Sequence, residues 1–178
     1  MILETERLRL KPLELGDAPP LLAILRDPVA MEFWHRPAIT RAATGSEIVA
    51  AQLAAMADGQ FLYWTVWRDG DAIGSVDLSA LDFGHLRGEV GFLFRPDQWG
   101  QGMAREALVA LIAHAFGSLK LERLEARIHA GNRRAKKLVM ALGFQPEGRL
   151  RGHLLRDGIR HDVDVFGLLN RSNRKNGA

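Results

Sequence analysis

Apolar and polar residues alternate along several short segments of the chain, as they do in strands that bury one face. Together with segments rich in aromatic and β-branched residues, they predict about seven strands, at 7–11, 61–67, 72–78, 88–94, 124–129, 145–150 and 162–169. Asp-Gly pairs at 69–70 and 157–158 predict tight turns that close two hairpins. The strands between residues 61 and 94 should therefore form an antiparallel meander.

Other segments repeat their apolar residues with the period of a helix. The strongest begins at Met103 and carries Ala104, Ala107, Leu108, Leu111, Ile112 and Ala115 on one face. A second runs from Ala135 to Leu142, and Gly143 is placed to end it. Two short helices are expected before these, one after the candidate N-cap Asp17 and one from near Thr44 to Ala57.

The order of these elements predicts one α/β (α+β) domain over residues 1–170, with a continuous mixed sheet and about four flanking helices. Of the 178 residues, 47% are hydrophobic and 25% charged, which is typical of a globular protein. No apolar run approaches the ~20 residues of a membrane-spanning helix. The first ten residues alternate charge and apolarity, unlike a signal peptide, and cysteine is absent. We therefore expect a cytoplasmic protein that binds no membrane.

Charge and histidine patterns exclude two further classes. The net charge is only +3, and basic residues gather late in the chain, including a basic polar tail at 171–178. Because aromatic residues are not interleaved with these cations, we expect no direct binding of nucleic acid. The six histidines show no paired spacing on one helix, so no metal site is expected.

The segment 92–104 carries the clearest chemical signal, because it joins a strand to the strongest helix through a glycine-containing turn. Gly100 and Gly102 let the backbone approach an anion, and the unpaired N–H groups of the first helical turn would point toward it. The spacing differs from the glycine patterns of dinucleotide-binding folds and nucleoside triphosphatases. Two glycines alone would fit a simple tight turn equally well.

This segment resembles the pyrophosphate-binding motif of the GNAT superfamily, Arg/Gln-x-x-Gly-x-Gly/Ala, with matches at Gly102 and Ala104. Trp99 stands at the Arg/Gln position. That Trp-Gly-x-Gly form is similar to the one in the branch that acetylates the N-termini of ribosomal proteins (RimJ/RimL-like). Segments 3–8, 132–144 and 162–169 also look like the opening strand, the Asn-x-x-(Ser/Ala)…Gly-Phe segment and the closing strand of that branch. The chain is thus identified as a member of the GNAT superfamily of N-acetyltransferases.

The resemblance implies a mostly antiparallel GNAT sheet that splays between 88–94 and 124–129, where acetyl-CoA binds. It also implies the cofactor-binding residues Phe92, Leu93, Phe94, Trp99, Gly100, Gln101, Gly102, Met103, Ala104, Arg105 and Asn132. The strand residues among them would pair with pantetheine, the turn would hold the pyrophosphate, and Asn132 would reach the pantetheine arm. Arg105 or Lys137 would lie near the outer phosphate, although either fits a solvated helix-face charge as well. No metal is implied.

A direct transfer needs a base for the amine and stabilisation of the oxyanion, for which a backbone N–H near Phe94 is available. Glu89 is the candidate catalytic base, because GNAT enzymes often carry an acidic residue at this position; the alternative is an edge-strand charge facing water. The usual tyrosine donor is missing from the second crossover helix. Either His129, Ser75 or Asp164 protonates the leaving thiolate, or water does.

Three functions remain open for a monomer or homodimer of this kind. The first is acetylation of the N-terminal α-amine of a protein, as in the ribosomal-protein branch. The second is acetylation of a small amine such as an aminoglycoside or polyamine, for which Asp77, Asp82 and Glu89 would supply an acidic cleft. The third is a GNAT-like module that binds acyl-CoA without catalysis.

Overall fold

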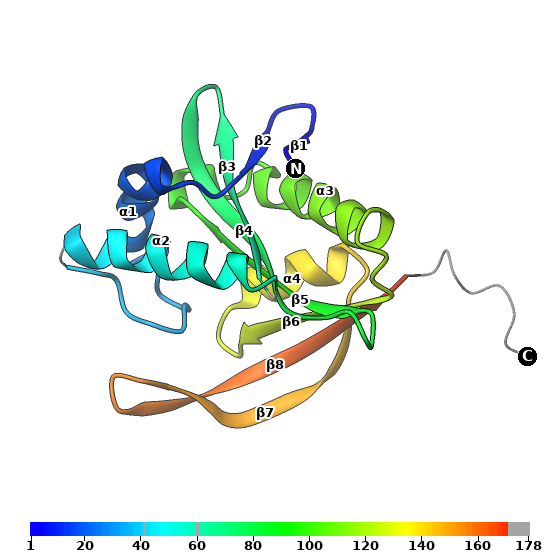
Figure 1. Ribbon diagram of the computed structural model, residues 1–178. Coiled ribbons are helices and arrows are strands. Elements are labelled where there is room, and N and C mark those ends of the chain that lie inside the picture. Colours follow the sequence, from blue (N-terminus) through cyan, green and yellow to red (C-terminus); the bar gives the residue numbers. More distant parts are fainter. Residues whose placement is uncertain (41, 60, 171–178) are drawn as a thin grey trace, which may run out of the picture.

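The computed structural model describes residues 1–40, 42–59 and 61–170. Within this part of the chain, eight strands form one sheet in the spatial order β1-β2-β3-β4-β5-β6-β8-β7 (Figure 1). All neighbours are antiparallel except β5 and β6, which are parallel. The strands are β1 (Leu3–Glu4), β2 (Arg9–Pro12), β3 (Leu62–Arg68), β4 (Asp71–Asp82), β5 (Arg87–Phe94), β6 (Arg123–His129), β7 (Gln145–Arg156) and β8 (Ile159–Leu169). The predicted mixed sheet is confirmed, with the two-residue β1 as an additional strand.

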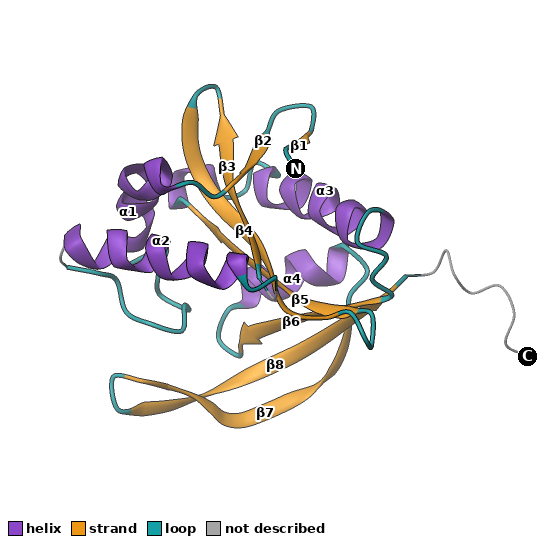
Figure 2. Cartoon of the chain, in the orientation of Figure 1, coloured by secondary structure: helices purple, strands orange, loops and turns teal. Residues whose placement is uncertain are grey.

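Helices cover both faces of the sheet. Figure 2 shows α1 (Ala18–Arg26) and α2 (Ala42–Ala57) on one side, and α3 (Met103–Gly117) and α4 (Arg133–Ala141) on the other. Two short 3₁₀ turns, η1 (Leu15–Asp17) and η2 (Pro96–Gln98), precede α1 and α3. These α-helices agree with the four predicted from periodicity. The predicted basic polar tail at 171–178 lies outside the described residues.

The alternation of side chains along the strands produces two hydrophobic cores, one on each face of the sheet. Trp64, Val76 and Val90 belong to the larger core, which is completed by α3 and α4. Tyr63 and Leu93 belong to the smaller core, which is completed by α1 and α2. Neighbouring residues such as Tyr63 and Trp64 of β3 therefore belong to different cores.

The pairing between β5 and β6 ends soon after it begins. The two strands share three paired positions, the last being Glu89 with Glu125. Beyond that point, residues 90–94 of β5 pair with β4 alone, and β6 continues along β8. The splay predicted between 88–94 and 124–129 is confirmed. It leaves main-chain N–H and C=O groups of β5 open to an extended ligand.

The β7–β8 hairpin is longer than the sequence pattern predicts, with strands of 12 and 11 residues. Register shifts follow Pro146 and Leu150, so the alternation of apolar and polar residues is interrupted twice. Strand β7 is also the exposed edge of the sheet, where polar residues are tolerated on both faces. The predicted turn is present, with φ of 51° at Asp157 and 77° at Gly158.

Asp17 is the N-cap residue of α1, as predicted, but its carboxylate makes no bond to that helix. Its Oδ2 instead accepts hydrogen bonds from Thr65 Oγ1 at 2.7 Å and from the backbone N–H of Glu14 at 3.2 Å. Because Thr65 is buried in β3, its hydroxyl cannot donate to water, and the Asp17 carboxylate provides the acceptor that it needs. This contact joins the start of α1 to the centre of the sheet.

Packing of α3 against the sheet predicts a contrast between two of its residues. Leu111 is fully buried, whereas Val109 is 46% exposed. Leu111→Ala should lower the free energy of unfolding by about 3 kcal/mol, because the substitution leaves a cavity in the larger core. The matched Val109→Ala should change it by less than about 1 kcal/mol. Urea denaturation measures both values, and equal losses would contradict the packing of α3.

Candidate active site

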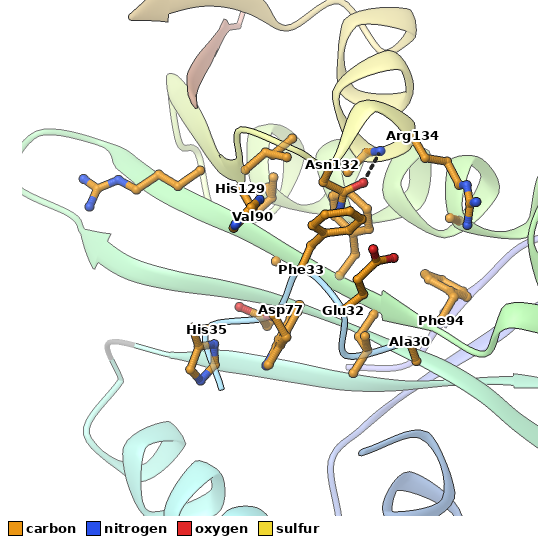
Figure 3. Close-up of a pocket in the computed structure, with 18 of the residues that line it drawn as sticks. Ala30, Glu32, Phe33, His35, Asp77, Val90, Phe94, His129, Asn132 and Arg134 are labelled. Atoms are coloured by element: carbon orange, nitrogen blue, oxygen red, sulfur yellow. Dashed lines mark hydrogen bonds between the residues drawn. The ribbon is translucent and has the colours of Figure 1, made fainter. Parts of the chain in front are cut away.

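A cavity of about 900 Å³ opens where β5 and β6 separate (Figure 3). Its walls come from both separating strands, the first turns of α4, the segment between α1 and α2, and residues of β4 and β7. Aromatic side chains, among them Phe33, Trp34, Phe61 and Phe92, make much of the lining apolar. The cavity thus gathers residues from nearly the whole length of the chain.

The predicted acetyl-CoA residues divide into two groups. Those that line the cavity are Phe92, Leu93, Phe94, Trp99, Ala104 and Asn132. Those that do not are Gly100, Gln101, Gly102, Met103 and Arg105. Met103 is buried in the larger core, and the Gln101 side chain donates to the carbonyl of Asp97, so only main-chain groups of these two remain for a ligand. Their roles stay predictions.

Two glycines shape the turn between β5 and α3. Gly100 and Gly102 have φ of 76° and 82°, in the left-handed region that favours glycine. Gly102 is the N-cap of α3, so the helix presents its unpaired N–H groups from this point. Arg7 Nη1 donates to the carbonyl of Gln101 at 3.2 Å, and the same guanidinium pairs with Glu106 in the first turn of α3. That pairing offsets the negative charge of Glu106 in the first turn of α3.

The indole of Trp99, the departure from the family motif, makes a hydrogen bond and a cation–π contact. Its indole Nε1 donates to the carbonyl of Phe94 at 3.0 Å, which fixes the end of β5. The guanidinium of Arg134, at the start of α4, lies 4.0 Å from the centre of its ring, a cation–π arrangement. Arg134 lines the cavity, as does Lys137, whereas Arg105 does not. Sequence reasoning missed Arg134 because nothing in the spacing links it to Trp99.

Asn132 caps α4 at the edge of the cavity. Its Oδ1 accepts a hydrogen bond from the backbone N–H of Ala135 at 3.0 Å, the dashed line in Figure 3. This bond orients the side chain so that the amide N–H₂ group is left to donate to something else. The arrangement is compatible with the predicted contact to pantetheine.

Glu89, the predicted base, lies at the last position where β5 still pairs with β6. It lines the cavity, and its carboxylate is 3.3 Å from Arg127 Nε on β6. Burial raises the pKa of Glu89, Arg127 opposes that rise, and Glu125 adds to it. A carboxyl with a raised pKa is better suited to accept a proton at neutral pH than an ordinary glutamate.

Asp77 on β4 is the less expected carboxylate of the cavity. It is paired across the sheet with Gly91 of β5 and Tyr63 of β3, and its exposure is only 9%. Burial, reinforced by the charge of Glu89, raises the pKa of Asp77 to about 7. A Cβ on Gly91 would lie 2.7 Å from the Asp77 Cγ, so glycine at 91 leaves the space that this carboxylate fills.

The candidate proton donors are not equally placed. Tyr63 is buried, and burial raises its pKa to about 12, which makes it a poor acid at neutral pH. Ser75 and Asp164 do not line the cavity. His129 does, and its Nδ1 accepts the backbone N–H of Gly131 at 3.0 Å, so the neutral ring carries its proton on Nε2. Burial is the main cause that lowers the pKa of His129 and favours this neutral form.

The segment between α1 and α2 is tied to the β7–β8 hairpin by Arg156. Its guanidinium Nη1 donates to the carbonyl oxygens of Met31 at 3.1 Å and Trp34 at 3.4 Å, and also to that of Glu32. Phe33 lies within this segment and packs 5.2 Å from the His129 ring. One arginine thereby holds a wall of the cavity in place.

In the part of the chain that the structure describes, no group of three or more histidine, aspartate and glutamate residues is arranged to hold a metal ion. None of the helices described is both long and apolar enough to cross a membrane.

Burial of Asp77 predicts a pH-dependent penalty on stability. Its pKa is about 7 in the folded chain and about 4 in an unfolded one, so folding loses stability as the pH rises from about 4 to about 7. Asp77→Asn has no ionisable group at this position, so its folding stability does not fall for this reason. The variant should melt roughly 5 °C above the wild type near pH 8, with a smaller difference toward pH 4. Thermal unfolding across this range measures the effect, and a difference independent of pH would contradict the raised pKa.

The geometry of the glycine turn predicts a second outcome. Gly102→Glu should abolish CoA binding, because the new carboxylate would occupy the predicted phosphate site. Gly102→Ala is the matched control, since it imposes a similar left-handed strain of about 1 kcal/mol without a charge. In calorimetric titrations we expect a loss of at least about 100-fold for glutamate and less than about tenfold for alanine. Unchanged affinity in Gly102→Glu would refute the proposed turn.

Comparison with known proteins identifies the family. Residues 7–145 match the family described as "Acetyltransferase (GNAT) domain". The "Uncharacterized N-acetyltransferase p20" of Bacillus licheniformis is 32% identical over 95% of this chain and 96% of its own length. The spermidine N(1)-acetyltransferase of Escherichia coli K12 is 25% identical over 80% of this chain and 75% of its own length.

Two solved structures show the same fold at lower identity. A RimL ribosomal L7/L12 α-N-protein acetyltransferase in complex with coenzyme A has a TM-score of 0.87 at 16% identity, covering 97% of this chain and 100% of that one. A spermidine N-acetyltransferase from Vibrio cholerae, in complex with CoA and spermine, has a TM-score of 0.82 at 22% identity, covering 93% and 96%. With its splayed sheet, glycine turn and family match, the chain belongs to the GNAT acetyltransferase family and is an acyltransferase that uses acetyl-CoA.

Proposed function

We propose that the enzyme transfers the acetyl group of acetyl-CoA to the N-terminal α-amine of a protein, of the ribosomal-protein type. The observation that carries this proposal is the charge of the cavity. Apart from the cations of α4, the described lining has three carboxylates, Glu32, Asp77 and Glu89, against two guanidiniums, Arg36 and Arg127. When all three carboxyl groups are ionised, which an ammonium group beside Asp77 favours, the excess of one negative charge suits an acceptor with a single ammonium group.

The walls around these charges also favour a peptide terminus. Phe33, Trp34 and Phe61 offer apolar surface on which the side chain of a first residue can pack. The Trp-Gly-x-Gly form of the turn, at Trp99 to Gly102, is similar to that of the branch that acetylates ribosomal proteins. Likeness to the RimL structure supports the proposal at the level of the fold.

In the proposed mechanism, acetyl-CoA lies along the open edge of β5, with its pyrophosphate at the glycine turn. Glu89 takes one proton from the acceptor ammonium, directly or through water. The neutral amine nitrogen then attacks the thioester carbonyl carbon, and a backbone N–H near Phe94 stabilises the oxyanion. When the C–S bond breaks, the nitrogen loses its second proton, which passes through water to the CoA thiolate; a neutral His129 ring is too weak an acid to supply it. The product is the N-acetylated acceptor, in which the acetyl group is bound to the amine nitrogen as an amide.

A small amine is the second candidate acceptor, because relatives named spermidine acetyltransferases match most of the chain. A polyamine carries several ammonium groups. Arg36 and Arg127 in the same lining would repel the additional ones, which makes this acceptor the less favoured of the two.

Release of CoA thiol from acetyl-CoA, measured with a panel of acceptors, tests the proposal. The panel contains peptides that begin with Ala, Ser or Met, the same peptides blocked at the N-terminus, polyamines and aminoglycosides. We expect turnover with peptides that have a free α-amine and none with the blocked controls. Turnover with polyamines or aminoglycosides alone would replace the proposal by the second candidate.

A further inference from the structure

We propose that Asp77 and Glu89 together form the binding site for the ammonium group of the acceptor, with Asp77 as its principal anionic partner. The inference rests on the proposed function in one respect, that the acceptor is a primary amine that enters protonated. It assigns a role to Asp77 that is separate from the proton acceptance assigned to Glu89.

Sheet geometry places the two carboxylates side by side. Asp77 faces Gly91 across the β4–β5 ladder, and Ser79 faces Glu89 two positions away. Asp77 and Glu89 are therefore diagonal neighbours on one face of the sheet, about 7 Å apart at Cβ. Both line the cavity at the point where the strands separate. An ammonium group placed between them can reach both carboxylates.

The Asp77 carboxylate has no partner among the residues that the structure describes. None of them donates a hydrogen bond to it, and none lies within 4.0 Å as a counter-ion. Arg127 of β6, which also lines the cavity, is paired with Glu89 and Glu125 instead. A carboxylate that is nine-tenths buried without donors is costly, so its presence in a cavity wall points to a ligand that supplies them.

The side chains around Asp77 do not bond to its carboxylate, which is therefore available to a ligand. Tyr63 is paired with Asp77 across the β3–β4 ladder, but its hydroxyl is not hydrogen-bonded to that carboxylate. His35 and Arg36 come from the segment before α2 and also line the cavity, but neither is bonded to Asp77. Gly91 contributes only space. Figure 3 shows Asp77 at the cavity wall, on the same side as His35.

The pair divides the work of binding and deprotonation. The ammonium donates N–H bonds to Asp77 and to Glu89, and one proton then passes to a Glu89 oxygen. Asp77 keeps its charge and holds the amine while the nitrogen lone pair attacks. Because the pKa of Asp77 is about 7, acceptor affinity should rise as the pH rises through that value. The rise should end where the α-amine loses its own proton, near pH 8.

Calorimetry with CoA-saturated enzyme tests the assignment. One peptide is titrated in two forms, with a free α-amine and with an acetylated one, into the wild type, Asp77→Asn, Glu89→Gln and Asp82→Asn. Asp82→Asn is the matched control, since Asp82 is on the same strand but does not line the cavity. We expect Asp77→Asn to weaken binding of the free-amine form at least about tenfold, and that of the acetylated form by less than about a factor of two.

Two further readouts separate binding from a structural role. Asp77→Asn should leave the KM of acetyl-CoA within about a factor of two of the wild type and should flatten the pH dependence of the acceptor KM between about pH 6 and pH 7.5. Glu89→Gln should lower kcat by at least about 100-fold. Wild-type affinity of Asp77→Asn for the free-amine peptide, or equal losses for both peptide forms, would overturn the proposal.

Failure of this inference is distinguishable from failure of the proposed function. If the wild type acetylates no peptide, the proposed function fails, and the same comparison is made with the small amine that is turned over and with its N-acetylated product. If the wild type acetylates peptides while Asp77→Asn behaves as Asp82→Asn does, the ammonium site fails and the proposed function stands.

Discussion

The end of main-chain pairing between β5 and β6 at Glu89 is the constraint on which the rest of the site depends. Unpaired N–H and C=O groups inside a protein are costly, so the main-chain groups exposed where a sheet opens need hydrogen-bond partners from water or a ligand. Each of the two strands is held by another neighbour, β5 by β4 and β6 by β8, so the separation is fixed in the absence of ligand. The cavity, the open edge and the position of Glu89 all follow from it.

Sequence reasoning predicted the parts of this site that lie close together along the chain. The glycine turn and the helix after it occupy one short segment, and their periodicity and left-handed glycines follow from local sequence. It missed the contacts between distant segments, such as Trp99 with Arg134, because no spacing links them. It placed Asp77 only in a general acidic cleft, since the sequence does not reveal that Gly91 will face it. The length of the β7–β8 hairpin was also underestimated, because its bulges interrupt the alternation of apolar and polar residues.

The site is also where the fold gives up stability. Asp77 is buried without a hydrogen bond from the described residues, and the Arg36 Nε is buried without a partner among them. Such groups weaken a fold unless a ligand completes them. The larger core, packed from fully buried residues of β3 to β6 and α3, offsets these losses and keeps the strands in register. The cavity takes residues from both faces of the sheet, Val90 and Phe94 from the larger core and Tyr63 and Leu93 from the smaller one.

Arg156 joins the β7–β8 hairpin to the opposite wall of the cavity, because its guanidinium donates hydrogen bonds to main-chain carbonyl oxygens of the segment before α2. The bonds go to main-chain oxygens, so they are indifferent to which side chains the segment carries. Residues 32–35 can therefore change identity without losing their anchor. Under the proposed function, the wall that faces the acceptor can then vary in its side chains while its main chain keeps its place.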